Sequence, residues 1–423
     1  MWKLVVMLIF AGLTIIATNE STDTECNLLD AFTICQRSHV LTFVNQTQEG
    51  DKLEIRSHKL SAIAPHAFQD LRITNLTLNF ERFDGEPGII DLKQESFQGL
   101  PSVTLLEIRN TIFSIKPNPF KHLKSLKYLL LVDDGIAELP VEFFVDLSQL
   151  KEFLIKGHEI KAITVDTFSK MNPNIQSIAI YGGELQRVES KSFERFNQMK
   201  YLMLTGNKLT YLLSGTFDGL DELEELHLDY NSITVLPQDI FKGLLKLRIL
   251  NLESTGIKPD SRIFSGLNVI DLRLGFNDIE ELPAGVFGAL GQLKSLDLRG
   301  NKLTTVSNDV FNHLPHLQTL NLERNTINRI EPNAFSGLTL KSLKLNRNAL
   351  EVLEANVFSD LHITTLDLSG NSIKDIKPQA FRLLEVQTIL LFDNKVNQLH
   401  RYSWGLSDTV EIIEEEKRQV VFE

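Results

Sequence analysis

The side chains that most often carry out chemistry form no known catalytic pattern in this chain of 423 residues. The spacings GxGxxG, GxxxxGK[ST], GxSxG, HExxH and CxxC are all missing, and these are the common signatures of nucleotide, nucleophile and metal sites. His313 and His316 are three residues apart, but no third ligand lies in register with them. We therefore predict no catalytic residue, no metal and no cofactor, and an enzyme is the weakest of the functional alternatives.

The only two cysteines, Cys26 and Cys35, can form a disulfide. They lie just before a long apolar repeat, whose first turn needs a cover on its open edge. Closing so short a loop contributes roughly 2 to 3 kcal/mol in an oxidising compartment. The alternative is a pair of free buried thiols.

The first 17 residues have the composition of a secretory signal peptide. Lys3 is followed by an apolar run from Leu4 to Ala17, and cleavage is expected between Ala17 and Asn19. The run is shorter than the roughly 18 to 20 residues that cross a bilayer, although a signal anchor is the alternative. No second apolar span follows, so we predict a secreted, extracellular protein with no membrane span after signal removal.

Secretion would make three sequons candidate glycosylation sites, at Asn19, Asn45 and Asn75. The formal net charge of −12 argues against a nucleic-acid partner, because phosphate binding requires a dense Lys and Arg surface.

One pattern, seen in Tyr201–Phe217 as YLMLTGNKLTYLLSGTF, returns across most of the chain. Its phenylalanine recurs every 23 to 25 residues, and once after 29. About fifteen turns follow, with no Gly or Pro at the core strand positions. A fixed period of this size indicates a solenoid in which each turn buries its flat faces against its neighbours.

The first apolar residue of each strand triplet is taken as position 1. Residues at positions 4 and 6 then point into the core, because side chains alternate across a strand. Asparagine recurs at position 9, where its amide can bond backbone groups as the chain bends away from the strand. This predicted asparagine ladder comprises Asn207, Asn231, Asn277, Asn301, Asn325, Asn348, Asn371 and Asn394.

Other residues replace asparagine at position 9 in the earlier turns and once in the later ones. These are His58, Glu81, Thr111, Asp134, His158, Gly183 and Thr255. The N-terminal half is therefore expected to be less regular and locally less stable, with no side-chain bond at Gly183.

The spacing LxxLxLxxN resembles that of extracellular leucine-rich repeat proteins of the 24-residue type, a group that includes Toll-like receptor ectodomains, adhesion proteins and arthropod leucine-rich immune proteins. The resemblance implies an α/β solenoid, a horseshoe with a parallel concave β-sheet and an irregular or short-helical convex side. The implied organisation is a signal peptide at 1–17, an N-terminal cap at 18–49, repeats at 50–406, and an acidic C-terminal tail or cap at 407–423. The cysteine-rich C-terminal cap usual in this group is missing, so truncation is an open alternative.

The outward positions of the concave sheet are the third, fifth, seventh and eighth of each turn. In several middle turns they are apolar or aromatic, and aromatic-rich patches are typical of protein interfaces. The alternative is the ordinary β-propensity of these residue types. The predicted ligand-binding patch contains Tyr128, Leu130, Val132, Leu154, Tyr181, Tyr201, Met203 and Tyr230.

The outward columns of the later turns hold mixed charges, which usually pair across strands. Glu225, Asp229 and Glu253 form an acidic group between the two kinds of surface.

Because the resembling proteins act by binding, the expected function is recognition of an extracellular or cell-surface protein through the concave face, in innate immunity or cell adhesion. A homo- or hetero-dimer is possible. The alternative is a structural matrix component without a specific concave-face ligand.

Overall fold

The computed structural model describes residues 5–8, 13–16, 24–57, 59–80, 88–113, 118–133 and 135–415. They belong to two compact units, each described by itself. The first unit comprises Met1–Lys208 and Thr216–Leu220, and the second comprises Leu209–Gly215 and Asp221–Glu423.

A parallel sheet runs along the first unit, and successive turns contribute its strands in sequence order. Its strands are β6 (Lys52–Arg56), β8 (Asn75–Asn79), β10 (Leu105–Arg109), β12 (Tyr128–Val132), β13 (Glu152–Lys156), β15 (Ser177–Tyr181) and β17 (Tyr201–Met203).

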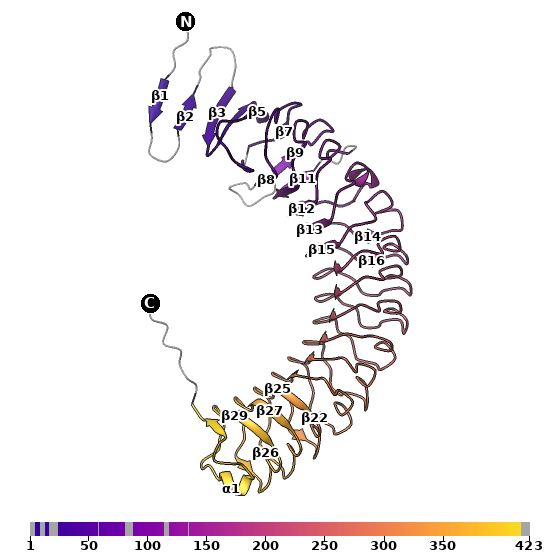
Figure 1. Cartoon of the computed structure of the whole chain (residues 1–423), viewed down its shortest axis with the longest axis vertical. Coiled ribbons are helices and arrows are strands. Elements are labelled where there is room, and N and C mark those ends of the chain that lie inside the picture. Colours follow the sequence, from indigo (N-terminus) through magenta and orange to yellow (C-terminus); the bar gives the residue numbers. More distant parts are fainter. Residues whose placement is uncertain are drawn as a thin grey trace. The chain divides into compact units, whose positions relative to one another are not determined.

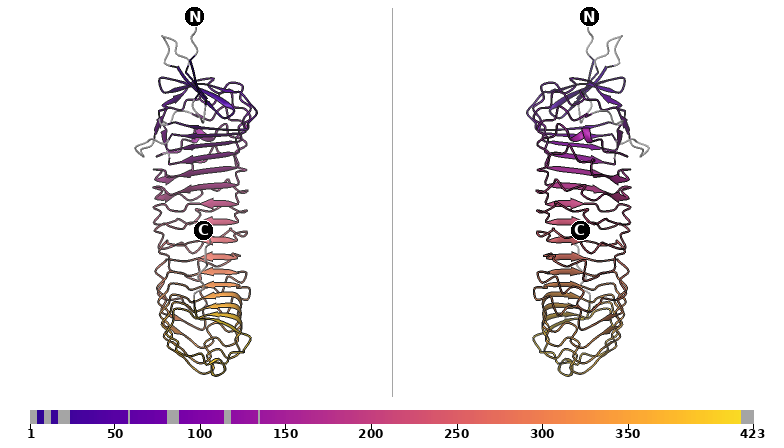
Figure 2. Two further views of the ribbon diagram at one scale, coloured as in Figure 1. Left: turned by 90° about the vertical axis from the view of Figure 1, so that its left-hand side faces the viewer. Right: turned by 90° about the vertical axis from the view of Figure 1, so that its right-hand side faces the viewer.

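The second unit repeats this arrangement, mostly with shorter strands (Figures 1 and 2). They are β18 (Glu225–His227), β19 (Ile249–Asn251), β20 (Asp271–Arg273), β21 (Ser295–Asp297), β23 (Thr319–Asn321), β25 (Thr339–Lys344), β27 (His362–Asp367), β29 (Glu385–Leu390) and β30 (Glu411–Ile413).

The core of each unit is built from the inward strand residues and the phenylalanine column. Leu202 and Leu204 of one turn, like Leu296 and Leu298 of another, are fully buried. Each such residue contributes roughly 1.5 to 3 kcal/mol by leaving water. In the second unit the phenylalanine rings follow one another from turn to turn, with centroids 5.6 to 6.3 Å apart from Phe264 to Phe381. The Phe264 ring is tilted against Phe287, and the rings from Phe287 to Phe381 are stacked.

Outside the main sheet, the turns of each unit contain short two-stranded pieces. These are β9 (Gly88–Ile90) with β11 (Thr111–Phe113), β14 (Ala162–Ile163) with β16 (Arg187–Val188), β22 (Thr305–Val306) with β24 (Arg329–Ile330), and β26 (Val352–Leu353) with β28 (Asp375–Ile376). Among the described residues, the helices are η1 (Val141–Phe144) and α1 (Arg401–Trp404). The predicted fold class, a parallel-strand solenoid with an irregular and only briefly helical outer side, is confirmed.

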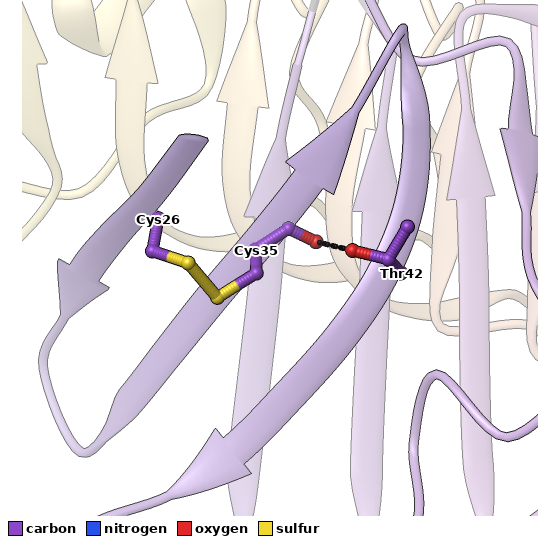
Figure 3. Close-up of a disulfide and its surroundings, with 3 residues drawn as sticks. All are labelled: Cys26, Cys35 and Thr42. Atoms are coloured by element: carbon purple, nitrogen blue, oxygen red, sulfur yellow. Dashed lines mark hydrogen bonds between the residues drawn. A yellow bond between two sulfur atoms is a disulfide. The ribbon is translucent and has the colours of Figure 1, made fainter. Parts of the chain in front are cut away.

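An antiparallel cap precedes the repeats of the first unit. It contains β3 (Thr24–Leu29), β4 (Phe32–Arg37) and β5 (Val40–Gln46), and β7 (Ala62–Ile63) joins it in parallel. A disulfide joins Cys26 of β3 to Cys35 of β4, and these two residues are directly paired in the sheet (Figure 3). The Thr42 hydroxyl donates to the Cys35 carbonyl at 3.1 Å.

The chain termini are described only in part. Of the predicted signal peptide, the structure describes β1 (Val5–Leu8) and β2 (Leu13–Ile16), which pair antiparallel. The expected cleavage position lies outside the described residues, and the signal peptide stays a prediction. At the other end β30 adds in parallel to β29, and Arg401 donates to the Val410 carbonyl at 2.8 Å. This part of the predicted C-terminal segment is therefore a strand.

Candidate binding surface

The register of the first unit's sheet places the apolar outward residues of neighbouring strands side by side. Leu130 of β12 is paired with Leu154 of β13, Leu154 with Ala179 of β15, and Ala179 with Met203 of β17. Leu130, Leu154 and Met203 are half-buried, whereas Ala179 is buried. These four residues form a row that crosses four strands, and we call it the apolar stripe.

Tyrosines flank the apolar stripe on both sides. One neighbouring row runs from Tyr128 through Glu152 and Ser177 to Tyr201, and the other contains Val132, Lys156 and Tyr181. The Tyr201 hydroxyl lies 3.8 Å from the Met203 sulfur, so this ring leans toward the stripe. Glu152 and Lys156 are exposed. The surface therefore has an apolar centre and a mixed polar edge, the arrangement found at protein interfaces.

Seven of the eight predicted patch residues lie in the first unit, and Tyr230 lies in the second. Tyr230 is 56% exposed, and its hydroxyl donates to Glu253 Oε1 at 3.2 Å. The negative charge of Glu253, together with partial burial, raises the pKa of the Tyr230 hydroxyl.

In the second unit the ladder asparagines join consecutive turns through buried hydrogen bonds. Asn325 is representative, because its Nδ2 donates to the carbonyls of Leu298 and Leu322 at 3.0 and 3.1 Å. Its Oδ1 accepts from the Leu303 amide at 3.1 Å. Thr255, which interrupts the series, keeps part of this pattern, since its hydroxyl donates to the Leu252 carbonyl at 2.9 Å.

His158 and Gly183 occupy ladder positions on consecutive turns of the first unit and are complementary in size. A Cβ atom at Gly183 would lie 2.5 Å from the His158 ring, so the imidazole fills the space of the missing side chain. His158 is 2% exposed; its Nδ1 accepts from the Ile160 amide at 3.2 Å, while its Nε2 has no partner among the described residues. Burial lowers the pKa of His158 to about 4, against a smaller opposing effect of Glu184.

Four other first-unit residues replace asparagine at position 9, and they are Thr111, His58, Glu81 and Asp134. Thr111 is buried. His58, Glu81 and Asp134 lie outside the described residues.

The outward surface of the second unit is charged and contains a bridge that the sequence did not predict. Arg299 donates to both oxygens of Glu253, at 3.1 and 2.9 Å, and contacts Asp297 at 2.9 Å. Glu253 and Arg299 come from turns separated by one other turn, which has Gly275 at the same position. A Cβ at Gly275 would lie 3.3 Å from the Arg299 side chain, so glycine leaves room for the bridge. Gly275 at this position is the feature of the sequence that could have indicated the bridge between Glu253 and Arg299.

The predicted glycosylation sites differ in accessibility. Asn45 of β5 is exposed, whereas Asn75 of β8 is half-buried and accepts from the Thr74 hydroxyl at 3.1 Å. Asn19 lies outside the described residues. All three sites stay predictions.

Within the described residues, no three His, Cys, Asp or Glu side chains are grouped as a metal site would need, and His313 and His316 are both exposed. None of the helices within the same ranges has the length and apolar character to cross a membrane.

Family models match most of the repeat region. The model described as "Leucine rich repeat" matches overlapping segments that together run from 173 to 396, more than half of the chain. A second, "BspA type Leucine rich repeat region (6 copies)", matches 61–200. The chain belongs to the leucine-rich repeat family.

Several curated proteins are similar in sequence to parts of the chain. Tsukushi of Rattus norvegicus is 26% identical over 294 residues, which are 62% of this chain and 75% of that protein. Trophoblast glycoprotein of Macaca fascicularis is 40% identical over 17% of this chain and 18% of its own length. Toll-like receptor 3 of Bos taurus is 36% identical over 18% of this chain and 8% of its own length. The chain thus spans less than a fifth of the latter two relatives.

Solved structures share the fold. The chain in the TLR13–ssRNA13 complex has a TM-score of 0.68 at 23% identity, covering 86% of this chain and 54% of that one. The mouse RP105/MD-1 complex gives 0.60 at 19%, covering 85% and 73%. These solved structures show that the chain shares the leucine-rich repeat solenoid fold.

Proposed function

We propose that this chain is a secreted protein that binds another protein through the apolar stripe and its flanking tyrosines, in immune recognition or cell adhesion. The observation that carries the proposal is the pairing of Leu130, Leu154, Ala179 and Met203 across adjacent strands. A row of this kind offers apolar area to a partner, and aromatic residues around it commonly contribute most of the binding energy.

Similar proteins support the recognition role. Toll-like receptor 3 is a receptor, and RP105 forms a complex with MD-1. The predicted signal peptide and the Cys26–Cys35 disulfide support secretion, because disulfides persist in oxidising compartments.

The test replaces the apolar stripe without altering the core. Leu130, Leu154 and Met203 are each changed to Thr, which keeps strand propensity but removes apolar area. The matched control, Ser295→Thr with Ser342→Thr, introduces the same residue at outward strand positions of the second unit. Each secreted protein is cross-linked to its neighbours on cells, and the captured proteins are quantified by mass spectrometry.

Partners captured by the wild-type and control proteins should be lost from the stripe variant. If all three proteins capture the same neighbours in equal amounts, the binding role of the stripe is wrong and a structural matrix component becomes the better interpretation. Sedimentation of the purified proteins tests a second copy of the chain as the partner, because a stripe-mediated dimer would dissociate in the variant.

A further inference from the structure

Two exposed aromatic residues of the second unit hold a backbone conformation that bulky side chains rarely adopt. Tyr230 and Phe276 both have a φ of 53°, and they are 56% and 42% exposed. They occupy position 8 of their turns, where the other turns of this unit also have positive φ, with Gly300 and Gly370 in two of them and Ser254, Arg324, Arg347 and Asp393 in the rest. Glycine is the residue best suited to this region, and other residue types are accommodated there as well, so folding does not require an aromatic side chain at either position.

The two rings lean toward the turns that follow them. The Tyr230 hydroxyl reaches Glu253 at 3.2 Å. The Phe276 ring covers Gly300, because a Cβ on that glycine would lie 2.4 Å from the ring. Ser254 lies at the same position of the turn between the two aromatics and is half-buried. The strand spacing of about 4.8 Å places Tyr230 and Phe276 roughly 10 Å apart, with the small Ser254 side chain between them.

The Phe276 ring already contacts one cation of this chain. The Arg299 guanidinium carbon lies 5.5 Å from the ring centroid while its nitrogens bind Glu253. Glu253 is therefore a buried carboxylate held between Tyr230 and Arg299, with a side-chain exposure of 8%. An aromatic ring beside a carboxylate is the chemical setting that attracts an ammonium or guanidinium group.

Charge on the outward positions around the two rings is predominantly negative. Two guanidinium groups, those of Arg273 and Arg299, lie among five carboxylates: Glu225, Asp229, Glu253, Asp271 and Asp297. Burial raises the pKa of Asp297, and Glu253 and Asp271 add to the rise against the opposing effect of Arg299. The local excess of negative charge thus favours a positively charged partner.

We propose that Tyr230 and Phe276 each bind a lysine or arginine side chain from one basic segment of a partner protein, with the surrounding carboxylates providing the opposing charge. The exposed part of each ring can receive one such cation, because cation–π attraction acts within about 6 Å of a ring centroid. The proposal does not depend on the apolar stripe, which lies in the other unit.

The test uses the full chain and a fluorescently labelled synthetic peptide in which lysine and arginine alternate with serine. The matched peptide carries glutamate in place of each basic residue. Binding is measured by fluorescence anisotropy at low ionic strength. The wild-type protein should bind the basic peptide and not the acidic one. Phe276→Gly and Tyr230→Gly should each weaken binding roughly tenfold.

Three variants separate the rings from the backbone. Tyr230→Phe keeps the ring and should retain binding within about twofold. Ser254→Gly makes the same kind of backbone change, since Ser254 has a φ of 52°, but keeps both rings and should bind normally. Phe276→Asn replaces the ring by a residue that tolerates positive φ, so it tests the ring again if the glycine variant folds poorly.

Melting temperatures distinguish recognition from a structural role. The two glycine variants should melt at or above the wild-type temperature, because glycine suits this backbone conformation. The proposal is overturned if the wild-type protein does not bind the basic peptide, if it binds the acidic peptide equally, or if both glycine variants bind undiminished. The apolar-stripe variant should bind the peptide normally, so the failure of either proposal can be recognised separately.

Discussion

The two units are built from the same repeat, yet earlier turns of the first unit depart from the asparagine ladder, and the two units present different surfaces. In the second unit, asparagines such as Asn301 and Asn325 bond the backbone of two turns at once. In the first unit, Asn207 makes the same kind of bonds, whereas His158 fills the corresponding space by volume and its ring accepts one hydrogen bond, from the Ile160 amide. The first unit carries the apolar stripe, whereas the second carries charges and two exposed aromatics.

This difference shows that inward and outward positions of the repeat vary independently. The buried leucines and phenylalanines are alike in both units, because each turn must close the same slice of core. The outward side chains contribute little to that core, so they can differ for binding. Ladder positions are less constrained than inward positions and more constrained than outward ones. Several side chains can occupy a ladder position, and they differ in their effect on stability and on its pH dependence.

The largest expected effect is the loss of a ladder asparagine in the second unit. Asn301 accepts from the amides of Asn277 and Ile279 and donates to the carbonyls of Leu274 and Leu298. Asn301→Ala leaves these buried groups without partners, which should lower the free energy of unfolding by about 3 to 5 kcal/mol. Urea denaturation followed by circular dichroism measures the change.

Asn346→Ala is the control for this loss. The Oδ1 of Asn346 has no hydrogen-bond partner among the described residues, so its removal should change stability by less than about 0.5 kcal/mol. Similar losses in the two variants would contradict the role assigned to the ladder.

Acid should weaken the first unit through His158. Its pKa is about 4 in the folded chain and roughly 6.5 when unfolded, so the unfolded state binds the extra proton more readily. Neutral His158 makes its full contribution to the free energy of unfolding above pH 6.5, and this contribution is lost as the pH falls to about 4. The loss approaches about 3 kcal/mol.

Urea denaturation at a series of pH values tests this dependence in the wild type and in His158→Asn. The variant should lose the part of the pH dependence that falls in this window. The exposed His316→Asn is the control and should keep it. A wild-type slope that persists in His158→Asn would assign the acid sensitivity to other groups.

A smaller effect is expected from adding a ladder side chain at Gly183. Gly183→Asn brings a Cβ to 2.5 Å from His158 and should destabilise the chain by about 2 kcal/mol. The same change in a His158→Asn background should cost much less, because the space is then open. A double-mutant cycle with denaturant unfolding measures this coupling, and additive effects would show that the two positions do not share the space.

Much of the architecture could be predicted from the sequence because it depends on periodic, local rules. Alternation at Leu202 and Leu204 predicts an inward row, and the recurrence of phenylalanine predicts a stack. The fit between two side chains on neighbouring turns is harder to predict. From the sequence alone, Gly183 indicates only that a ladder hydrogen bond is missing, whereas the structure shows that the His158 ring fills the space beside it. The sequence places Tyr230 in the same patch as the other tyrosines, because its residue type does not reveal its left-handed backbone; Gly300 and Gly370 in the same column are a usable signal of that conformation.

The smallest expected effect concerns the stability contribution of the apolar stripe. Leu154 is half-buried, and its strand neighbours Phe153 and Ile155 provide the core contacts. Leu154→Thr introduces a β-branched strand former at an outward position, so the free energy of unfolding should change by less than about 1 kcal/mol. Phe153→Ala, an inward change on the same strand, should cost about 3 to 5 kcal/mol. If Leu154→Thr proves as costly as Phe153→Ala, the stripe serves folding, and the contrast in surface use between the units fails.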